Sequence, residues 1–208
     1  FWSVSAKLFS LHLNRVSSAQ RGFAMTSAQQ SKRAQVKEIY SAEQIQARIK
    51  ELGKQISKDY SGVEKPVVIG VMKGAICFLA DLLREIKVDQ PMQVEFVRLA
   101  SYGAATESSG TVQAPYLDLP NLFHRNIIVI EDIVDSGRTA HFFMSYLKDQ
   151  FEPKSLKLAC FLDKPSRRVV EFTADYVGFT IEDLFVIGYG LDFNENYREL
   201  PYLGEYTP

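Results

Sequence analysis

The stretch from Ile127 to Ala140, which reads IIVIEDIVDSGRTA, constrains the fold more than any other part of the chain. It starts with four apolar residues in a row, which is the pattern of a strand buried on both faces of a sheet. Two carboxylates, Glu131 and Asp132, follow at once, and they would be costly to bury without partners. Gly137 then allows a tight turn. The segment therefore predicts a buried strand, a turn and a helix in immediate succession, which is the repeating unit of an α/β fold.

The rest of the chain alternates in the same way between short apolar runs and amphipathic stretches. A helix is expected to begin at Ser41, because SAEQ has the spacing of a capping box. Strands are expected at 66–71, 93–99, 126–130, 155–162, 174–178 and 184–187, and further helices at 75–86 and 141–150. This order predicts an α/β fold with a mostly parallel sheet. Ligands bind such sheets at the carboxyl ends of the strands.

The polar groups that follow Ile130 suit a ligand that carries both hydroxyl groups and a phosphate. Backbone N–H groups at the start of a helix, with the hydroxyls of Ser136 and Thr139, would hold a phosphate. The carboxylates of Glu131 and Asp132 would accept hydrogen bonds from hydroxyl groups, and a ribose phosphate presents both. The sequence has no GxxxxGK[ST] motif of a P-loop. The remaining alternative is a plain capped helix behind solvated acids.

Charge is distributed unevenly along the chain. The first 37 residues contain six basic and no acidic side chains, which leaves 18 basic against 25 acidic residues in the remainder, a net charge of about −7. An acidic body has no general nucleic-acid footprint, and no apolar run approaches the roughly 20 residues that span a bilayer. We therefore expect neither nucleic acid nor membrane as a partner. Residues 38–208 are expected to form the functional domain.

Residues 1–37 are expected to be a basic, disordered extension or a targeting segment. They are rich in Ser and Ala, a composition that resembles an organellar transit peptide. An extension without a role, a fragment and a translated upstream leader remain open, because the chain starts with Phe1. The expected location is the cytoplasm, with organellar import only if this segment is a transit peptide. The two cysteines, Cys77 and Cys160, lie in apolar stretches and are expected to be buried reduced thiols.

The segment IIVIEDIVDSGRTA closely resembles the signature of the type I phosphoribosyltransferase family. Other stretches resemble the bacterial-type hypoxanthine-guanine phosphoribosyltransferases of that family: VMKGAICFLADLLREI, VRLASYG, FLDKPSRR and DYVGFTIEDLFVIGYGLDFNENYRELPYLG. Together they cover roughly residues 40–205. The resemblance implies a mostly parallel twisted sheet flanked by helices, with a small hood built from the terminal segments.

The resemblance also implies an activity in purine salvage. The enzyme would transfer the 5-phosphoribosyl group from phosphoribosyl diphosphate to N9 of hypoxanthine or guanine, giving IMP or GMP and pyrophosphate. Xanthine as the base remains open, as does a regulatory RNA-binding protein on the same scaffold, although the latter would favour a basic surface. The family further implies Mg²⁺ as cofactor and a homodimer or homotetramer.

The same resemblance assigns roles to individual positions. The catalytic residue would be Asp135, facing N7 of the purine as general base or acid. Phosphoribosyl diphosphate would be bound by Lys73, Gly74, Ser101, Tyr102, Glu131, Asp132, Ile133, Val134, Asp135, Ser136, Gly137, Arg138, Thr139 and Arg198. The purine would be bound by Asp135, Lys164, Phe185, Val186 and Asp192, and the metal ligands would be Glu131, Asp132 and Asp192.

Each of these roles has a structural alternative. Lys164 would donate to the 6-oxo group of the base, but taken alone it could be a surface lysine. Phe185 would stack on the purine face, but ordinary core packing is the alternative. Asp135 could also be a simple turn or cap residue. The resemblance further implies a cis peptide bond between Met72 and Lys73.

Overall fold

The computed structural model describes residues 36–99 and 117–207. The described fold begins at Val36, so the predicted extension lies almost entirely outside it and its role stays a prediction. Ser101 and Tyr102, which the resemblance places in a loop that closes over the site, also lie outside the described residues. Within these ranges, no helix combines the length and apolar character needed to cross a membrane.

The central element is a parallel sheet of five strands in the order β3-β2-β4-β5-β6. Every neighbouring pair is parallel, so the predicted α/β class and parallel sheet are confirmed. The strands are β2 (Val67–Met72), β3 (Gln93–Arg98), β4 (Asn126–Val134), β5 (Ser155–Asp163) and β6 (Tyr176–Thr180). Since β4 lies in the middle, its run of four apolar residues is buried from both sides.

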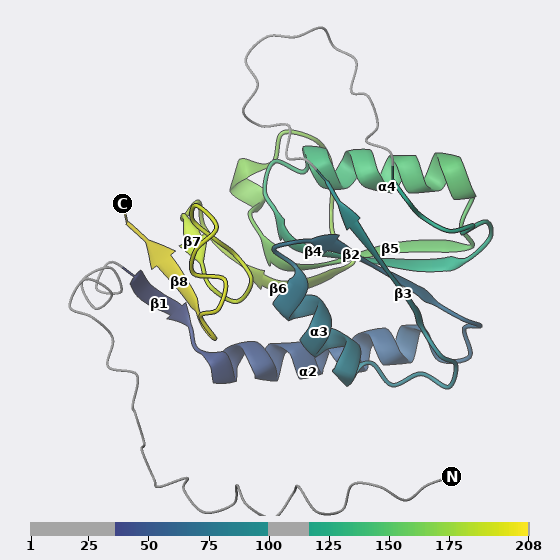
Figure 1. Cartoon of the computed structure of the whole chain (residues 1–208), viewed down its shortest axis with the longest axis horizontal. Coiled ribbons are helices and arrows are strands. Elements are labelled where there is room, and N and C mark those ends of the chain that lie inside the picture. The colour runs from purple at the N-terminus through teal and green to yellow at the C-terminus, as the bar shows by residue number, and fades with distance from the viewer. Residues whose placement is uncertain (1–35, 100–116, 208) are drawn as a thin grey trace, which may run out of the picture. The chain divides into compact units, whose positions relative to one another are not determined.

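Helices cover both faces of this sheet. Figure 1 shows α2 (Ala42–Asp59) and α3 (Ile76–Glu85) on one face and α4 (Arg138–Phe151) on the other. The capping box expected at Ser41 is present, because the Ser41 hydroxyl accepts from the Gln44 amide while the Gln44 side chain accepts from the Ser41 amide. A short 3-10 helix, η1 (Pro165–Arg167), follows β5.

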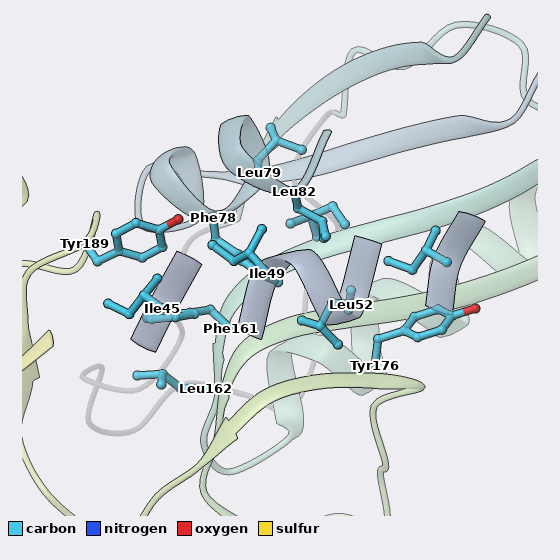
Figure 2. Close-up of a cluster of buried hydrophobic side chains, with 14 of the residues drawn as sticks. Ile45, Ile49, Leu52, Phe78, Leu79, Leu82, Phe161, Leu162, Tyr176 and Tyr189 are labelled. Atoms are coloured by element: carbon cyan, nitrogen blue, oxygen red, sulfur yellow. The ribbon is translucent and has the colours of Figure 1, made fainter. Parts of the chain in front are cut away.

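Each face of the sheet has its own apolar core. Figure 2 shows the core beneath α2 and α3, where Phe161 of β5 packs with its ring centroid 5.6 Å from Phe78 and 4.9 Å from Tyr189. The second core lies under α4 and contains Cys160, which is fully buried as predicted. Cys77 is only partly buried, because it lies near the start of α3, and both cysteines are free thiols.

A second, smaller sheet joins the two ends of the described fold. It consists of β1 (Val36–Tyr40), β8 (Leu203–Tyr206) and β7 (Val186–Ile187), all antiparallel. We call it the terminal sheet. It confirms the small hood of terminal segments that the family resemblance implied. Neither β1 nor β8 was predicted as a strand, because each is short and only partly buried.

Several predicted boundaries were wrong. β4 does not stop at Ile130 but continues to Val134, since Glu131 still pairs with Cys160 of β5 and Val134 with Asp163. The two acids therefore belong to a strand rather than to the loop behind it. The strand expected at 174–178 lies at Tyr176–Thr180, and the strand expected at 184–187 is only Val186–Ile187.

Candidate active site

A pair of adjacent acids, Glu131 and the less buried Asp132, lies near the carboxyl end of β4. Glu131 is 8% exposed. Burial raises the pKa of Glu131 well above its usual range, and the adjacent Asp132 carboxyl raises it further. Burial also raises the pKa of Asp132, although Arg198 opposes that change by its positive charge. The protein thus holds two carboxyl groups side by side where water is largely excluded.

The turn into α4 leaves the start of this helix open to an anion. Gly137 is its N-cap and has φ of 81°, a left-handed conformation that glycine adopts without strain. Gly137 has no side chain to cap the helix, and the first backbone N–H groups lack helical carbonyl partners and point outward with the positive end of the helix dipole. The Ser136 hydroxyl accepts weakly from the Arg138 amide at 3.4 Å. Such a turn can bind a phosphate.

Two loops from distant parts of the chain meet beside the acid pair of β4. A Cβ atom added to Gly74 would lie 1.4 Å from Oδ2 of Asp132, and one added to Gly190 would lie 2.2 Å from the Gly74 carbonyl oxygen. The loop after β7 therefore contacts the loop after β2 at Gly190, and the loop after β2 contacts the Asp132 side chain of β4 at Gly74. The peptide bond between Met72 and Lys73 is cis, as the resemblance implied.

The same meeting point carries a network of opposite charges. Lys73 Nζ donates to Glu195 Oε2 at 2.8 Å, and an Arg198 Nη lies 3.3 Å from the same oxygen. Arg198 also lies 2.7 Å from Oδ1 of Asp192 and donates to the Gly190 carbonyl at 2.8 Å. The hydrogen bonds from Lys73 and Arg198 lower the pKa of Glu195. Two cations predicted to bind a phosphorylated ligand are thus brought together with Asp192.

A second group of residues predicted to bind the ligand lies near β7 of the terminal sheet. Lys164 is buried, at 7% exposure, and donates to the Leu184 carbonyl at 2.7 Å. This excludes the alternative of a surface lysine. Phe185 is 52% exposed and meets Phe193 edge to face, with ring centroids 5.7 Å apart. Ordinary core packing is therefore excluded for Phe185, whereas the following Val186 is buried in β7.

Asp135 joins this group through an arginine that sequence reasoning had missed. Arg167 Nε lies 3.1 Å from the Asp135 carboxylate, and its Nη1 lies 3.3 Å from Asp183. Asp183 is also 4.0 Å from Lys164 Nζ. The charges of Asp135, Arg167, Asp183 and Lys164 therefore form one continuous chain.

Arg168 is a second residue that sequence reasoning had missed. It donates to the carbonyl oxygens of Val134 and Asp135 and pairs with Asp163. Its side chain also packs where a Cβ of Gly137 would lie, at 2.8 Å. Arg168 thus fixes the backbone between the acid pair and the turn at Gly137. The double arginine in DKPSRR was the available signal, but nothing in the sequence showed which carbonyls it would reach.

The acid pair fits a divalent cation. Within the described residues, 36–99 and 117–207, no cluster of three or more His, Cys, Asp or Glu side chains is placed to hold a metal. However, Mg²⁺ commonly takes only one or two protein carboxylates and completes its shell with water and substrate phosphates. The pKa values of Glu131 and Asp132 are raised by burial, so a cation beside them would relieve an unfavourable charge. Asp192, the third predicted ligand, is paired with Arg198 instead.

Comparison with known proteins agrees with this arrangement. The family model "Phosphoribosyl transferase domain" matches residues 35–194. The hypoxanthine-guanine phosphoribosyltransferase of Bacillus subtilis is 44% identical over 176 residues, which cover 83% of this chain and 93% of that protein. The bifunctional protein TilS/HprT of Listeria monocytogenes is also 44% identical, but the match spans only 26% of its length. A hypoxanthine-guanine phosphoribosyltransferase structure from Bacillus anthracis, 45% identical, superposes with a TM-score of 0.73 over 82% of this chain and 98% of that one.

Proposed function

The chain belongs to the phosphoribosyltransferase family, and we propose that it is a purine salvage enzyme. It transfers the 5-phosphoribosyl group of phosphoribosyl diphosphate to N9 of hypoxanthine or guanine and releases pyrophosphate. The observation that carries this proposal is the convergence of a buried acid pair, an uncapped helix start and a buried lysine at the carboxyl edge of one parallel sheet. Each of the three groups fits one part of the two substrates.

The ribose phosphate fits the end of β4 and the start of α4. Glu131 and Asp132 accept hydrogen bonds from the two ribose hydroxyls. The 5′-phosphate lies against the backbone amides of residues 136–139, where Gly137 turns the chain and the helix dipole favours an anion. Arg138 is exposed and contributes mainly its backbone amide.

The purine fits the start of the terminal sheet. Phe185 offers an exposed ring for stacking, and the backbone of Val186 lies beside it. Lys164 is a donor only, so it prefers the 6-oxo group of hypoxanthine or guanine to the amino group of adenine. Its ammonium group is held near the base by the Leu184 carbonyl, one residue before the stacking ring.

The pyrophosphate fits the network around Lys73 and Arg198. Lys73 precedes Gly74, which contacts Asp132, and the loop that carries Arg198 contacts Gly74 through Gly190. This supports a position for both cations near C1′ of the ribose. Preorganised cations stabilise the negative charge that develops on the leaving group. A bound Mg²⁺ would be held by Glu131 and Asp132 and would supply further neutralisation of this charge.

The protein's own groups account for the proton transfer. As C1′ loses pyrophosphate, positive charge develops on the sugar, and N9 of the purine attacks from the opposite face. The base must lose a proton, and the Asp135 carboxylate takes it at N7. Asp135 lies at the end of the segment that Arg168 braces, so its position relative to the phosphate turn is fixed.

A steady-state assay tests the proposal. The full chain is mixed with phosphoribosyl diphosphate, Mg²⁺ and each of hypoxanthine, guanine, xanthine and adenine, and nucleotide formation is followed. We expect IMP and GMP to form and adenine to be inert. If no 6-oxopurine gave a nucleotide, the enzyme assignment would be wrong, and RNA binding by the same chain would then be measured.

The proposal extends to assembly and location. We propose a homodimer or homotetramer, which light scattering of the purified chain tests directly. We propose a cytoplasmic location, with import only if residues 1–37 are removed as a transit peptide. Mass spectrometry of the mature N-terminus distinguishes these, since a processed start beyond residue 30 supports import.

A further inference from the structure

We infer that the Glu195 carboxylate takes the place of pyrophosphate in the ligand-free protein. Glu195 neutralises Lys73 and Arg198 until pyrophosphate displaces it. The inference rests on the proposed function, because it takes these two cations as the pyrophosphate contacts. It goes beyond that function by assigning an affinity-determining role to a residue that makes no contact with either substrate in the proposed complex.

A single oxygen of Glu195 bridges the two cations. Oε2 accepts from Lys73 Nζ at 2.8 Å and lies 3.3 Å from an Arg198 Nη. Lys73 and Glu195 are 122 positions apart in the sequence, so the contact is a product of the fold and not of local chain geometry. An anionic oxygen shared by a lysine and an arginine is the arrangement that a pyrophosphate oxygen would also adopt.

The Glu195 carboxylate can be exchanged, whereas Arg198 stays in place. The Glu195 and Lys73 side chains are 65% and 45% exposed, and exposed ion pairs contribute little because water and salt screen them. Arg198 has two further anchors, Asp192 at 2.7 Å and the Gly190 carbonyl at 2.8 Å. Departure of Glu195 therefore leaves Arg198 oriented and available to an incoming anion.

The backbone keeps Glu195 close even after it releases the cations. Asn194 and Glu195 have φ of 50° and 61°, a left-handed conformation that costs energy for residues other than glycine and persists only where the surroundings hold it. The Glu195 amide donates to Asp192 Oδ2 at 2.8 Å, and Asn196 and Phe193 bridge the same turn. The carboxylate thus remains a local competitor for the two cations.

Direct binding of pyrophosphate tests this inference. The full chain is titrated with pyrophosphate in the presence of Mg²⁺ by isothermal calorimetry, for the native protein and for Glu195→Gln. The amide keeps the shape of the side chain but removes its charge. We expect roughly 3- to 10-fold tighter binding by Glu195→Gln, the range that loss of one or two exposed ion pairs allows. Raising the salt concentration should reduce this gain.

The matched control is Glu199→Gln. Glu199 lies in the same loop and is exposed, and within the described residues its side chain has no ion pair. The control should leave the affinity for pyrophosphate within twofold of the native value. An equal gain in both variants would show a general charge effect and overturn the inference, as would weaker binding by Glu195→Gln.

A double variant separates this inference from the proposed function. In a Lys73→Gln background, Glu195→Gln should give a smaller gain than in the native chain, because one of the two released cations is gone. An unchanged gain would also overturn the inference. If the native chain bound no pyrophosphate at all, the proposed function itself would fail, whereas native binding that Glu195→Gln leaves unaltered removes only the role of Glu195.

Discussion

The two halves of the site hold charge in opposite ways. At the end of β4, Glu131 is buried and the adjacent Asp132 is partly buried, and desolvation raises both pKa values. In the loop of residues 188–198, Glu195 is mostly exposed, and its pKa is lowered by two cations. Strand pairing with β5 fixes the first group, whereas the second is stabilised by ion pairs that solvent can replace. The rigid half therefore holds acids that resist ionisation without a ligand, and the loop half holds charges that already have partners within the protein.

The largest expected effect tests whether Asp135 belongs to the chemistry or to binding. Asp135→Asn removes the carboxylate that we propose takes the purine proton but keeps its size and most of its hydrogen bonds. We expect kcat to fall about 100- to 10,000-fold, with the affinity for phosphoribosyl diphosphate changed by less than about threefold. Steady-state rates and calorimetry measure the two quantities. Equal losses in both would mean that Asp135 is a binding residue.

The next largest effect concerns Phe161, an aromatic ring on β5 of the rigid sheet. Phe161 is 1% exposed and packs against Phe78 and Tyr189. Truncation to alanine should cost about 3–5 kcal/mol in the free energy of unfolding, measured by urea denaturation. Phe161→Leu, which fills most of the space, should recover more than half of this loss. A cost below about 1 kcal/mol for the alanine variant would show that the core relaxes around the gap.

A third prediction uses the pH dependence of the buried acids. Because burial raises the folded-state pKa of Glu131 above its unfolded value, the unfolded chain loses the proton first. Stability should therefore fall as pH rises from about 4.5, until Glu131 ionises in the folded state as well. Glu131→Gln should remove part of this fall and stabilise the ligand-free protein at neutral pH by about 1–3 kcal/mol. Urea unfolding at several pH values without divalent cations measures the difference.

Glu43 provides the control for this pH series. It is exposed at the start of α2, and a hydrogen bond from the Ser41 hydroxyl lowers its pKa. Its contribution has the opposite sign, since it is present above the unfolded pKa and is lost as pH falls. Glu43→Gln should therefore not reduce the fall in stability at rising pH. If both glutamine variants behaved alike, burial would not be the cause.

The smallest expected effect concerns the exposed ring of Phe185, just before β7. Phe185→Ala should change the free energy of unfolding by less than about 1 kcal/mol, because the ring is half exposed. It should raise KM for hypoxanthine roughly tenfold, since an aromatic stack contributes about 0.5–1.5 kcal/mol. Phe185→Tyr keeps the ring and should leave KM nearly unchanged. A large loss of stability with an unaltered KM would place Phe185 in the fold and not in the site.

The same contrast explains which parts of the molecule could be predicted from sequence. The apolar run of β4 and the capping box at Ser41 are local patterns, so the parallel sheet and α2 followed from them. The end of β4 was placed too early, because the acids suggested a loop and their pairing with β5 is a long-range property. The strands β1 and β8 were missed because they are short and stabilised mainly by each other.

The site was only partly accessible to sequence reasoning. Motif spacing and family resemblance predicted Lys73, Asp135 and Arg198 as site residues, but the sequence did not indicate their ion-pair partners. Arg167 and Glu195 are exposed charged residues with no periodic pattern, and they meet their partners 32 and 122 positions away. Such contacts depend on how the loops converge, and no property of a short segment encodes them.

The pairing of β1 with β8 has a consequence for how the molecule is made. During synthesis, the five strands of the large sheet are complete once residue 180 has emerged from the ribosome. The terminal sheet must wait for Leu203–Tyr206, since β8 lies between β1 and β7. At translation rates of about 5–20 residues per second, β8 is complete about 1–5 s after the last strand of the large sheet. A nascent chain would thus complete the acid pair and the turn into α4 before β8 can pair with β1 and β7.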